Sequence, residues 1–593
     1  GGGRGESDLE KVMGQLSVCE YAEHIGEGEC RRLVEAGEAW VGPLRVNASN
    51  PLQAFVTCKG LARDVMVQGL ALRNRAMHED VVCVRRLPSA SAGDEGNAGE
   101  VLRIVDCNHK TTVVGCLEPY RARHPAHQAL FVPHDARVCP LLVPAATCPP
   151  SLFAPKPRGE GGEAPKPDLY CAEILGWEAG DPLPRGRLDR VLGPAGDIDA
   201  ETNALLLSNG VDTSPFGKEV LACVPPDSWT IPAEEVAKRR DLRGSGVRIC
   251  TIDPATAKDL DDALHIRKTP TGWEVGVHIA DVSYFVSPGT PLDAEAYARA
   301  TSTYLVQYCV PMLPHTLCEN LCSLNPKVDR LAFSVIWQFD DDLNVSGTWF
   351  GRTVIRCCCR MDYDTAQTVI ESNLQGSPVP PFAGKYRPEE GVTQGEVEGD
   401  VWMLYQISQK LRGARYRDGS VSINQVKVGF RLDDRMLPCE CTEHVQKEAN
   451  RLLEGVMLLA NTSVAARIAS VFPDRSLLRR HPPPIESGLQ KFAELCAKAH
   501  VPLASTSSKD MQNLFSSLSR QGAGRELGLV LMQGAAKAMQ LAEYFCTGSL
   551  GEEEWGHYAL AMDRYTHFTS PIRRYPDIVV HRLLQEAIDL GGG

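Results

Sequence analysis

Short apolar runs separated by glycine, proline and asparagine characterise the first part of the chain. Within residues 37–88 these runs are 40–46, 54–57, 64–67 and 78–84. Strands this short and this closely spaced predict a small β-barrel, and a fragment of a β-sandwich is less favoured because the strands are few. Before the barrel, apolar residues at helical spacing predict a short helical lead-in over residues 1–36.

A second β-barrel is predicted over residues 100–195. Its apolar runs are 100–105, 111–115, 129–132 and 169–175. Residues 149–168 are rich in proline, glycine and lysine and predict an insertion into this barrel. The few short strands favour the OB or cold-shock type for both barrels. Residues 196–245 predict a linker that ends in a short helix.

Residues 246–590 show a different pattern, in which strand-like runs are followed by helical ones. The strand-like runs are 247–252, 263–266, 273–282, 331–339 and 345–355, and the last two predict a hairpin. The helical runs are 401–415, 443–469, 539–545 and 577–588. We expect one large domain, a mixed sheet with helices, so the predicted fold class is α+β with two small barrels ahead of this domain.

Composition and charge restrict the functions that the chain can have. Of its 593 residues, 43% are hydrophobic and 23% are charged, which is typical of a globular protein with a sizeable core. The net charge is −13, so binding of nucleic acid would need a locally basic surface. No apolar run approaches the roughly 18 residues that cross a bilayer, so no membrane partner is expected. The chain starts with glycine rather than methionine, which predicts a piece of a longer protein.

The 21 cysteines are scattered and odd in number, which favours reduced thiols over a disulfide framework. The expected location is therefore intracellular, in the cytoplasm and/or the nucleus. Zinc binding is the alternative, because Cys439, Cys441 and His444 lie together and Cys318 is close to Cys322. Neither group has a second pair at zinc-finger spacing, so zinc is not favoured.

The most unusual stretch of the chain is acidic. Asp253, Asp259, Asp261 and Asp262 lie within ten residues, between two predicted strands. Folding would concentrate their mutual repulsion, and a hard divalent cation with oxygen ligands is the simplest compensation. An acidic surface turn is the alternative, since charge runs are usually solvated.

Five motifs follow one another along the large domain. They are TIDPATAKDLDDA at 251–263, VPMLP at 310–314 with LCSLNP at 321–326, ANRLLE at 449–454, LRRHPPP at 478–484, and YTHFTSPIRRY at 565–575 with HRLL at 581–584. Together they resemble the RNB family, the ribonuclease II type of exoribonuclease, over at least residues 230–590. Among the branches of this family, the sequence most resembles the eukaryotic exosome nucleases. More loosely, the chain resembles the RNB module of a vertebrate helicase with zinc-finger domains.

The resemblance implies an RNB catalytic domain behind two cold-shock barrels, with single-stranded RNA as partner and other modules of a longer parent chain, including a helicase, alongside. It further implies Mg²⁺-dependent hydrolysis from the 3′ end that releases nucleoside 5′-monophosphates. Two ions about 4 Å apart, for which Mn²⁺ can substitute, would activate water and stabilise the leaving oxygen. By the resemblance Asp253, Asp259, Asp261 and Asp262 form the metal site. We expect Asp253 and Asp262 to be direct ligands and Asp261 to be the least replaceable residue.

Basic residues are implied on the RNA side of the site. By the resemblance Arg573 is the catalytic arginine, whose guanidinium can hold the scissile phosphate, and Arg574 beside it also contacts RNA. A surface arginine in an ion pair is the alternative. Further candidates for a basic channel are Arg479, Arg480 and Arg582. RNA binding is then expected to weaken as salt rises.

Aromatic and polar residues complete the implied RNA site. Tyr304 and Tyr363 match positions at which the family stacks rings on terminal bases, and core packing is the alternative. Glu454 resembles the family's contact to a sugar hydroxyl near the 3′ end, and a carboxylate there would distinguish RNA from DNA. Asn450 lies one helical turn earlier and would support Glu454. Both could instead cap or bridge helices.

Three departures from the family pattern favour a second hypothesis. Gly455 stands where the family often has a second acid, and residues 420–427 differ from the usual sequence. No S1-type barrel is expected after residue 584. The favoured function is a 3′-to-5′ exoribonuclease, and the alternative is a catalytically weak or inactive RNB module that acts as an RNA-binding or protein-interaction platform.

Overall fold

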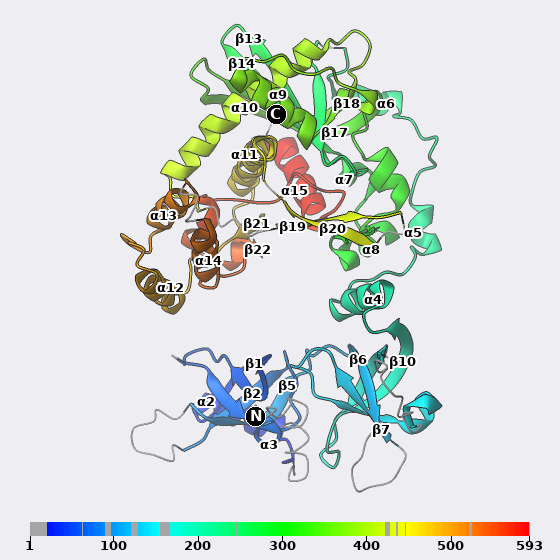
Figure 1. The fold of residues 1–593 in the computed structure, drawn as a ribbon, viewed down its shortest axis with the longest axis vertical. Helices are drawn as coiled ribbons and strands as arrows, with labels where there is room; N and C mark the ends of the chain where they lie inside the picture. The colour runs from blue at the N-terminus through cyan, green and yellow to red at the C-terminus, as the bar shows by residue number, and fades with distance from the viewer. Residues whose placement is uncertain are drawn as a thin grey trace. The chain divides into compact units, whose positions relative to one another are not determined.

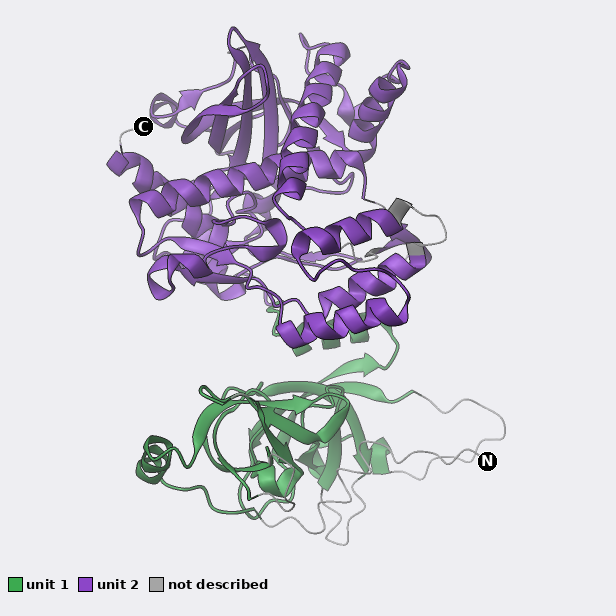
Figure 2. Ribbon diagram, turned by 90° about the vertical axis from the view of Figure 1, so that its left-hand side faces the viewer, with its two compact units in different colours: residues 1–213 green, residues 214–593 purple. Residues whose placement is uncertain are grey.

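The computed structural model describes residues 21–591, apart from residues 62, 89–96, 120–127, 154–165, 245, 422–426, 435–436, 445 and 521–524. The chain divides into two compact units, Gly1–Thr213 and Ser214–Gly593, which Figure 2 colours separately. Most of the predicted lead-in and most of the predicted insertion lie outside the described residues. In the described part of the lead-in, α2 (Glu27–Glu35) is a helix.

The first unit begins with a five-stranded antiparallel sheet in the order β3-β2-β1-β4-β5. Its strands are β1 (Trp40–Asn47), β2 (Asn50–Val56), β3 (Val65–Gln68), β4 (Val81–Arg86) and β5 (Gly99–Asp106), and the short helix α3 (Leu70–Arg73) follows β3. The sheet curls, since Met66 N on β3 donates to Asn97 O, close to β5, over 2.7 Å. Alternate residues of the strands, mainly valine, fill its core.

The position of β5 differs from the prediction. Residues 100–105 were predicted to open the second barrel, and this is wrong, because β5 pairs along β4 with Val101 opposite Val84. Val101 is buried in the core of the first sheet. Polar residues lie between β4 and β5, and such residues are as common between paired antiparallel strands as between domains.

The rest of the first unit is a closed barrel with strand order β10-β8-β7-β6-β9. Its strands are β6 (Thr112–Pro119), β7 (Gln128–Pro133), β8 (Leu141–Pro144), β9 (Asp168–Gly176) and β10 (Arg185–Pro194). The helix α4 (Ile198–Ser208) packs Ala200 and Ala204 against Val114 and Leu169 of this barrel. The first part of the predicted linker is therefore a helix of the first unit.

A six-stranded mixed sheet organises the second unit, in the order β11-β18-β12-β13-β14-β17. Its strands are β11 (Arg240–Asp241), β12 (Ile249–Asp253), β13 (Asp262–Thr269), β14 (Gly272–Ala280), β17 (Asp329–Phe339) and β18 (Val345–Asp362). The predicted hairpin is confirmed as β17 and β18. The long β18 pairs antiparallel with β17 and parallel with β12, which places Asp253 opposite Asp362.

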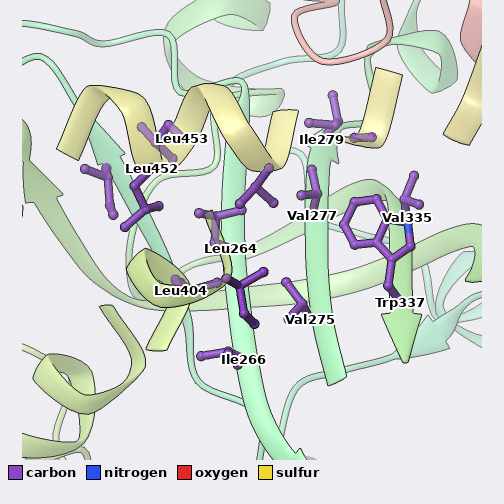
Figure 3. Packing of buried hydrophobic residues seen from close by; sticks show 14 of the residues in the cluster. Leu264, Ile266, Val275, Val277, Ile279, Val335, Trp337, Leu404, Leu452 and Leu453 are labelled. Atoms are coloured by element: carbon purple, nitrogen blue, oxygen red, sulfur yellow. The ribbon is translucent and has the colours of Figure 1, made fainter. Parts of the chain in front are cut away.

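Helices cover both faces of this sheet (Figure 1). On one face lie α9 (Tyr363–Gln375), α10 (Gln394–Arg417) and α11 (Glu448–Val471), and Figure 3 shows Leu404, Leu452 and Leu453 against the strands. On the other face lie α7 (Val282–Phe285), α8 (Pro291–Arg299) and the π-helix η3 (Thr316–Leu321). By length and composition α11 could cross a membrane, but 61% of its apolar window is buried within the protein, as in a core helix.

The remaining elements of the second unit surround this core. They are α5 (Lys218–Ala222), α6 (Ala233–Ala237), β15 (Thr303–Tyr304), β16 (Cys309–Val310), β19 (Lys427–Leu432), β20 (Pro438–His444), β21 (Leu477–Arg480), α12 (Glu486–Lys498), α13 (Ser508–Arg520), α14 (Arg525–Ala536), β22 (Glu543–Cys546) and α15 (Tyr575–Gly591). The predicted α+β class, with OB-like structure ahead of a mixed sheet with helices, is confirmed.

Candidate active site

The acidic loop connects two neighbouring strands of the six-stranded sheet. β12 ends at Asp253 and β13 begins at Asp262, and the two strands are antiparallel. The loop therefore leaves the sheet and returns to it at the same end of the two strands. Asp253 and Asp261 are 9% and 5% exposed, whereas Asp259 and Asp262 are half-buried. The structure thus places the four predicted aspartates together at one end of the sheet.

Side chains from other elements hold the backbone of this loop. Ser323 is buried, and its Oγ accepts from Leu260 N (3.1 Å) and donates to Lys258 O (2.8 Å). Arg360 on β18 and Lys385 donate to two further carbonyl groups of the loop, at 2.6 and 2.9 Å. The roles of these three residues could not be predicted from the sequence, because a bond to a backbone group of the loop leaves no pattern in the sequence.

The segment that carries Arg573 folds back onto the acidic loop. Ile572 N donates to Asp261 Oδ1 over 2.9 Å, although the two residues are 311 positions apart. Arg573 Nε lies 3.9 Å from Asp261 Oδ2, and its guanidinium also donates to Ser570 Oγ over 2.9 Å. The predicted metal-site aspartate and the predicted catalytic arginine are therefore neighbours.

A buried carboxylate at the start of α15 holds the arginine segment in shape. Asp577 Oδ1 accepts from Ser570 N (2.8 Å) and from the Arg574 guanidinium (2.7 Å). On the other side, Ser302 N donates to Arg573 O over 3.0 Å. Arg574, predicted to bind RNA, is thus bound to a carboxylate of the helix that follows it, while Arg573 stays 43% exposed.

The aspartates are buried without enough positive charge. Burial raises the pKa of Asp253 and Asp261 well above the usual range, and it raises the pKa of Asp262 to about 6. Arg573 opposes the shift at Asp261 and Asp262, and Arg360 opposes it at Asp253, but neither cancels it. Carboxylates that pay a desolvation cost and lack a counter-charge are suited to bind a cation.

The donor atoms fit Mg²⁺ or Mn²⁺. All are hard oxygen donors, and Asp253 Oδ2 is buried with no hydrogen-bond partner among the described groups. Among the described residues, however, no three carboxylate, imidazole or thiol groups are placed to hold one ion. A Mg²⁺ ion held by fewer than three of these groups would keep several waters and could accept substrate phosphate.

Both predicted stacking tyrosines lie at the acidic loop. The Tyr304 hydroxyl donates to Asp259 Oδ2, while 52% of the Tyr304 residue is exposed. Tyr363, the first residue of α9, is hydrogen-bonded to Asn450, and burial together with the loop carboxylates raises its pKa to about 12. Asn450 also accepts from Lys447 N over 2.9 Å, so it caps α11 as well as holding Tyr363.

Glu454 and its neighbour face different surroundings. The Glu454 side chain is 48% exposed, accepts from Gln446 Nε2 (3.2 Å) and lies 3.8 Å from the Arg415 guanidinium. At Gly455 a Cβ atom would come within 2.5 Å of Ser408 Oγ on α10. The missing second acid therefore reflects the close packing of α10 on α11. The other departure, residues 420–427, lies mostly outside the described residues.

The five arginines proposed for a basic channel differ in their partners. Three are paired with carboxylates at 2.7 Å, namely Arg480 with Glu543, Arg574 with Asp577 and Arg582 with Asp293. Their charge is already balanced inside the protein, so Arg480 and Arg582 no longer belong to the candidate channel. Within the described residues, Arg573 and Arg479 have no carboxylate at hydrogen-bond distance. These two are the arginines available to an anion.

Two family models match the chain. The model described as the RNB domain matches residues 239–589, which is more than half of the chain. The model described as Dis3-like cold-shock domain 2 matches residues 128–210, which contain the last four strands of the closed barrel and α4.

Similar proteins are named as exonucleases, and one of them is named as an inactive exonuclease. DIS3-like exonuclease 2 of Schizosaccharomyces pombe is 47% identical over 636 residues, which cover 98% of this chain and 67% of that protein. An Arabidopsis thaliana protein named inactive exonuclease DIS3L2 is 41% identical over 466 residues, which cover 77% of this chain and 43% of that protein. Among solved structures, Mycoplasma genitalium RNase R in complex with ribose methylated single-stranded RNA has a TM-score of 0.73 at 22% identity, covering 92% and 78% of the two chains. That likeness concerns the fold.

Proposed function

Because the chain belongs to the RNB family of exoribonucleases, we propose that it removes nucleotides one at a time from the 3′ end of single-stranded RNA, with Mg²⁺ as cofactor and nucleoside 5′-monophosphates as products. The observation that carries this proposal is the contact between the acidic loop and the Arg573 segment. It joins a site for metal-bound water to a guanidinium that can hold a phosphate, and phosphodiester hydrolysis needs both.

The aspartates and Arg573 have complementary roles in this mechanism. Asp253 and Asp262 would hold the metal directly, and Asp259 and Asp261 would complete its surroundings. When bound, Mg²⁺ supplies an activated water and neutralises charge on the leaving oxygen. Asp261 receives Ile572 N–H and lies next to the Arg573 guanidinium, so it fixes the distance between metal site and arginine. Arg573 can then donate two parallel hydrogen bonds to the scissile phosphate.

The 3′-terminal nucleotide is held by its base and its sugar. Tyr304 presents an exposed ring while its hydroxyl is held by Asp259, so it can stack on a base without losing its position. Tyr363 lies near Asp253 and Asp262 and is held by Asn450. The half-exposed Glu454 carboxylate can accept a hydrogen bond from a ribose 2′-OH, which DNA lacks.

A catalytically weak or inactive module that binds RNA or protein remains the second candidate. One observation favours it, because no three potential ligands in the described part of the chain are placed to hold one metal ion. A relative with 41% identity is named an inactive exonuclease. Against it, all four aspartates and Arg573 are present and lie together.

End-labelled single-stranded RNA distinguishes the two candidates. With Mg²⁺ we expect shortening from the 3′ end, and Asp261→Asn should lower its rate at least about a hundredfold because it removes charge from the metal site. A chelator should abolish the reaction. Retained RNA binding by the variant shows that it is folded. Binding without any shortening in generous Mg²⁺ or Mn²⁺ would establish the second candidate instead.

The reduced state of the cysteines supports a proposal for the cellular compartment. Every cysteine in the described part of the chain is free. Free thiols in this number suit a reducing compartment, so we propose an intracellular location, in the cytoplasm and/or nucleus. The loose resemblance to a helicase module stays a prediction.

A further inference from the structure

Two successive arginines of β21 have opposite surroundings. In the ladder with β22, Arg480 lies opposite Glu543, and Arg479 lies opposite Tyr544. Arg480 pairs with Glu543 at 2.7 Å and with Glu554 at 3.4 Å. The structure describes no carboxylate paired with Arg479. Consecutive strand residues point to opposite sides, so one charge is balanced and the other faces a different environment.

The Arg479 guanidinium is held by aromatic side chains. Its Cζ lies 4.8 Å from the centroid of the Tyr544 ring, and Arg479 is also hydrogen-bonded to Tyr544. The Tyr544 hydroxyl lies 2.5 Å from His567 Nδ1, and the His567 ring contacts the Tyr565 ring edge-on at 5.5 Å. A guanidinium held over a ring in this way loses little conformational entropy when it binds an anion.

The surroundings of His567, the histidine that contacts Tyr544, favour its neutral form. Burial, followed by the charges of Arg574, Arg479 and Arg573, lowers the pKa of His567 to about 2. Because Arg479 occupies an acceptor site of the Tyr544 oxygen, the hydroxyl proton is directed to His567 Nδ1. A neutral His567 that accepts this proton at Nδ1 carries its ring proton on Nε2.

Three arginines around one neutral imidazole need negative charge. Asp577 balances Arg574, and Asp261 lies 3.9 Å from Arg573 but is itself part of the metal site. Arg479 and Arg573 therefore leave two positive charges close to His567. Each phosphate of an RNA strand carries one negative charge, so two successive phosphates would balance the pair.

We propose that Arg479, held over the Tyr544 ring, binds the backbone phosphate on the 5′ side of the scissile phosphate. The inference rests on the proposed function. Release of a nucleoside 5′-monophosphate from the 3′ end breaks the last linkage of the strand, and Arg573 holds that phosphate. Every other phosphate of the strand lies to its 5′ side, and we assign Arg479 to the next linkage because its charge and that of Arg573 both act on His567. Arg479 thus sets affinity and register, and it takes no part in bond breaking.

The salt dependence of RNA binding tests the charge contact. With the metal removed by chelator, we expect Arg479→Ala to weaken binding of a single-stranded RNA about tenfold. The slope of log affinity against log salt should fall by about 0.7, the value for one phosphate contact on a single strand. Arg480→Ala is the matched control and should leave the slope unchanged, because Glu543 and Glu554 already balance that charge. Arg479→Lys keeps the charge and should restore most of the slope.

RNA with one uncharged methylphosphonate linkage identifies the phosphate. Moved along the strand from the 3′ end, this linkage should weaken binding to the intact protein at the penultimate position. For the variant Arg479→Ala, a methylphosphonate at the penultimate linkage should leave RNA binding unchanged. At every other linkage the methylphosphonate should affect the variant as it affects the intact protein. In Mg²⁺, Arg479→Ala should raise KM about tenfold and change kcat less than about threefold, whereas a residue that acts on the reacting phosphate would lower kcat.

The outcomes separate this inference from the proposed function. An unchanged salt slope in Arg479→Ala, an unchanged methylphosphonate profile, or a loss of kcat at constant KM would each overturn the role of Arg479. If the intact protein shows the penultimate-linkage effect but never shortens RNA, the phosphate contact stands and the exonuclease proposal fails. Melting curves of Arg479→Ala and Arg479→Lys check that a loss of binding is not a loss of fold.

Discussion

Glu454 shows how a single side chain can decide between two nucleic acids. Its carboxylate is 48% exposed, and its neighbours Gln446 and Arg415 hold it without enclosing it. Acceptor oxygens therefore remain open to a ligand hydroxyl. Because the carboxylate has no donor of its own, it can favour a sugar that offers a hydroxyl hydrogen over one that does not.

Glu454→Ala should therefore reduce the preference for RNA. We expect kcat/KM on RNA to fall about tenfold or more, since a hydrogen bond to a charged group contributes about 1.5–3 kcal/mol. On DNA of the same sequence kcat/KM should change little. The measurement is the ratio of the two rates. Gln446→Ala, which leaves the carboxylate in place, is the control, and an unchanged ratio in Glu454→Ala would rule out the 2′-OH contact.

At the scale of elements, α10 and α11 meet where both backbones come close. Gly455 of α11 faces Ser408 of α10, and Ser408 Oγ in turn donates to Arg451 O over 3.1 Å. Both helices also pack on the six-stranded sheet, so neither can move away without disturbing the core. The position that differs from the family pattern is thus fixed by helix packing rather than by chemistry.

Gly455→Ala tests this account of the helix contact. The added methyl group would lie 2.5 Å from Ser408 Oγ, and overpacking of this kind costs about 1–3 kcal/mol. On an open helix surface the same change would stabilise by up to about 1 kcal/mol. We expect a lower melting temperature, with partial recovery in Gly455→Ala/Ser408→Ala. A variant that melts at or above the temperature of the parent chain would show that the helices have room.

The sequence predicted several elements whose signal is local and missed contacts made over long distances. The predicted helix over residues 539–545 is wrong, because these residues lead into β22. Alternating apolar residues on both sides of the acidic loop predicted β12 and β13. The polar residues 340–344 between two strand-like runs predicted the hairpin of β17 and β18. The position of β5 was missed because a hairpin loop and a domain linker have the same composition. Arg360 binds a backbone carbonyl of the acidic loop, and Asp577 binds a backbone N–H of the Arg573 segment. Arg360 and its partner are far apart in the sequence, and both contacts form only in the folded chain.

The whole molecule carries a net charge of −13, and some of its acidic residues are buried in the candidate site. All residues of this site belong to the second unit, from Asp253 to Asp577. Arg573 and Arg479 supply the local positive charge that RNA would need, so overall acidity does not prevent binding. The buried aspartates nevertheless weaken the folded state until a cation joins them, which links metal binding to global stability.

This link predicts that Mg²⁺ and a product nucleotide stabilise the protein together. Each alone should raise the melting temperature slightly, and Mg²⁺ with AMP should raise it by more than the sum. The reason is that no three carboxylate, imidazole or thiol groups of the described residues are placed to hold one ion, so phosphate oxygens would complete the coordination. At a hundred times its Kd, a ligand that binds only the folded state adds about 2.7 kcal/mol.

The pH dependence gives this prediction a sign. The pKa of Asp262 is raised to about 6, above the value of about 3.9 in an unfolded chain. Without metal, its contribution to stability is therefore present below about pH 4 and is lost as pH rises through 6. Mg²⁺ binds the ionised carboxyl, so the stabilisation by Mg²⁺ and AMP should appear over the same range, small at pH 5 and full at pH 7.5. Asp262→Asn should remove this pH dependence and most of the stabilisation, and an equal effect at both pH values in the parent chain would contradict a role for this carboxylate as a ligand.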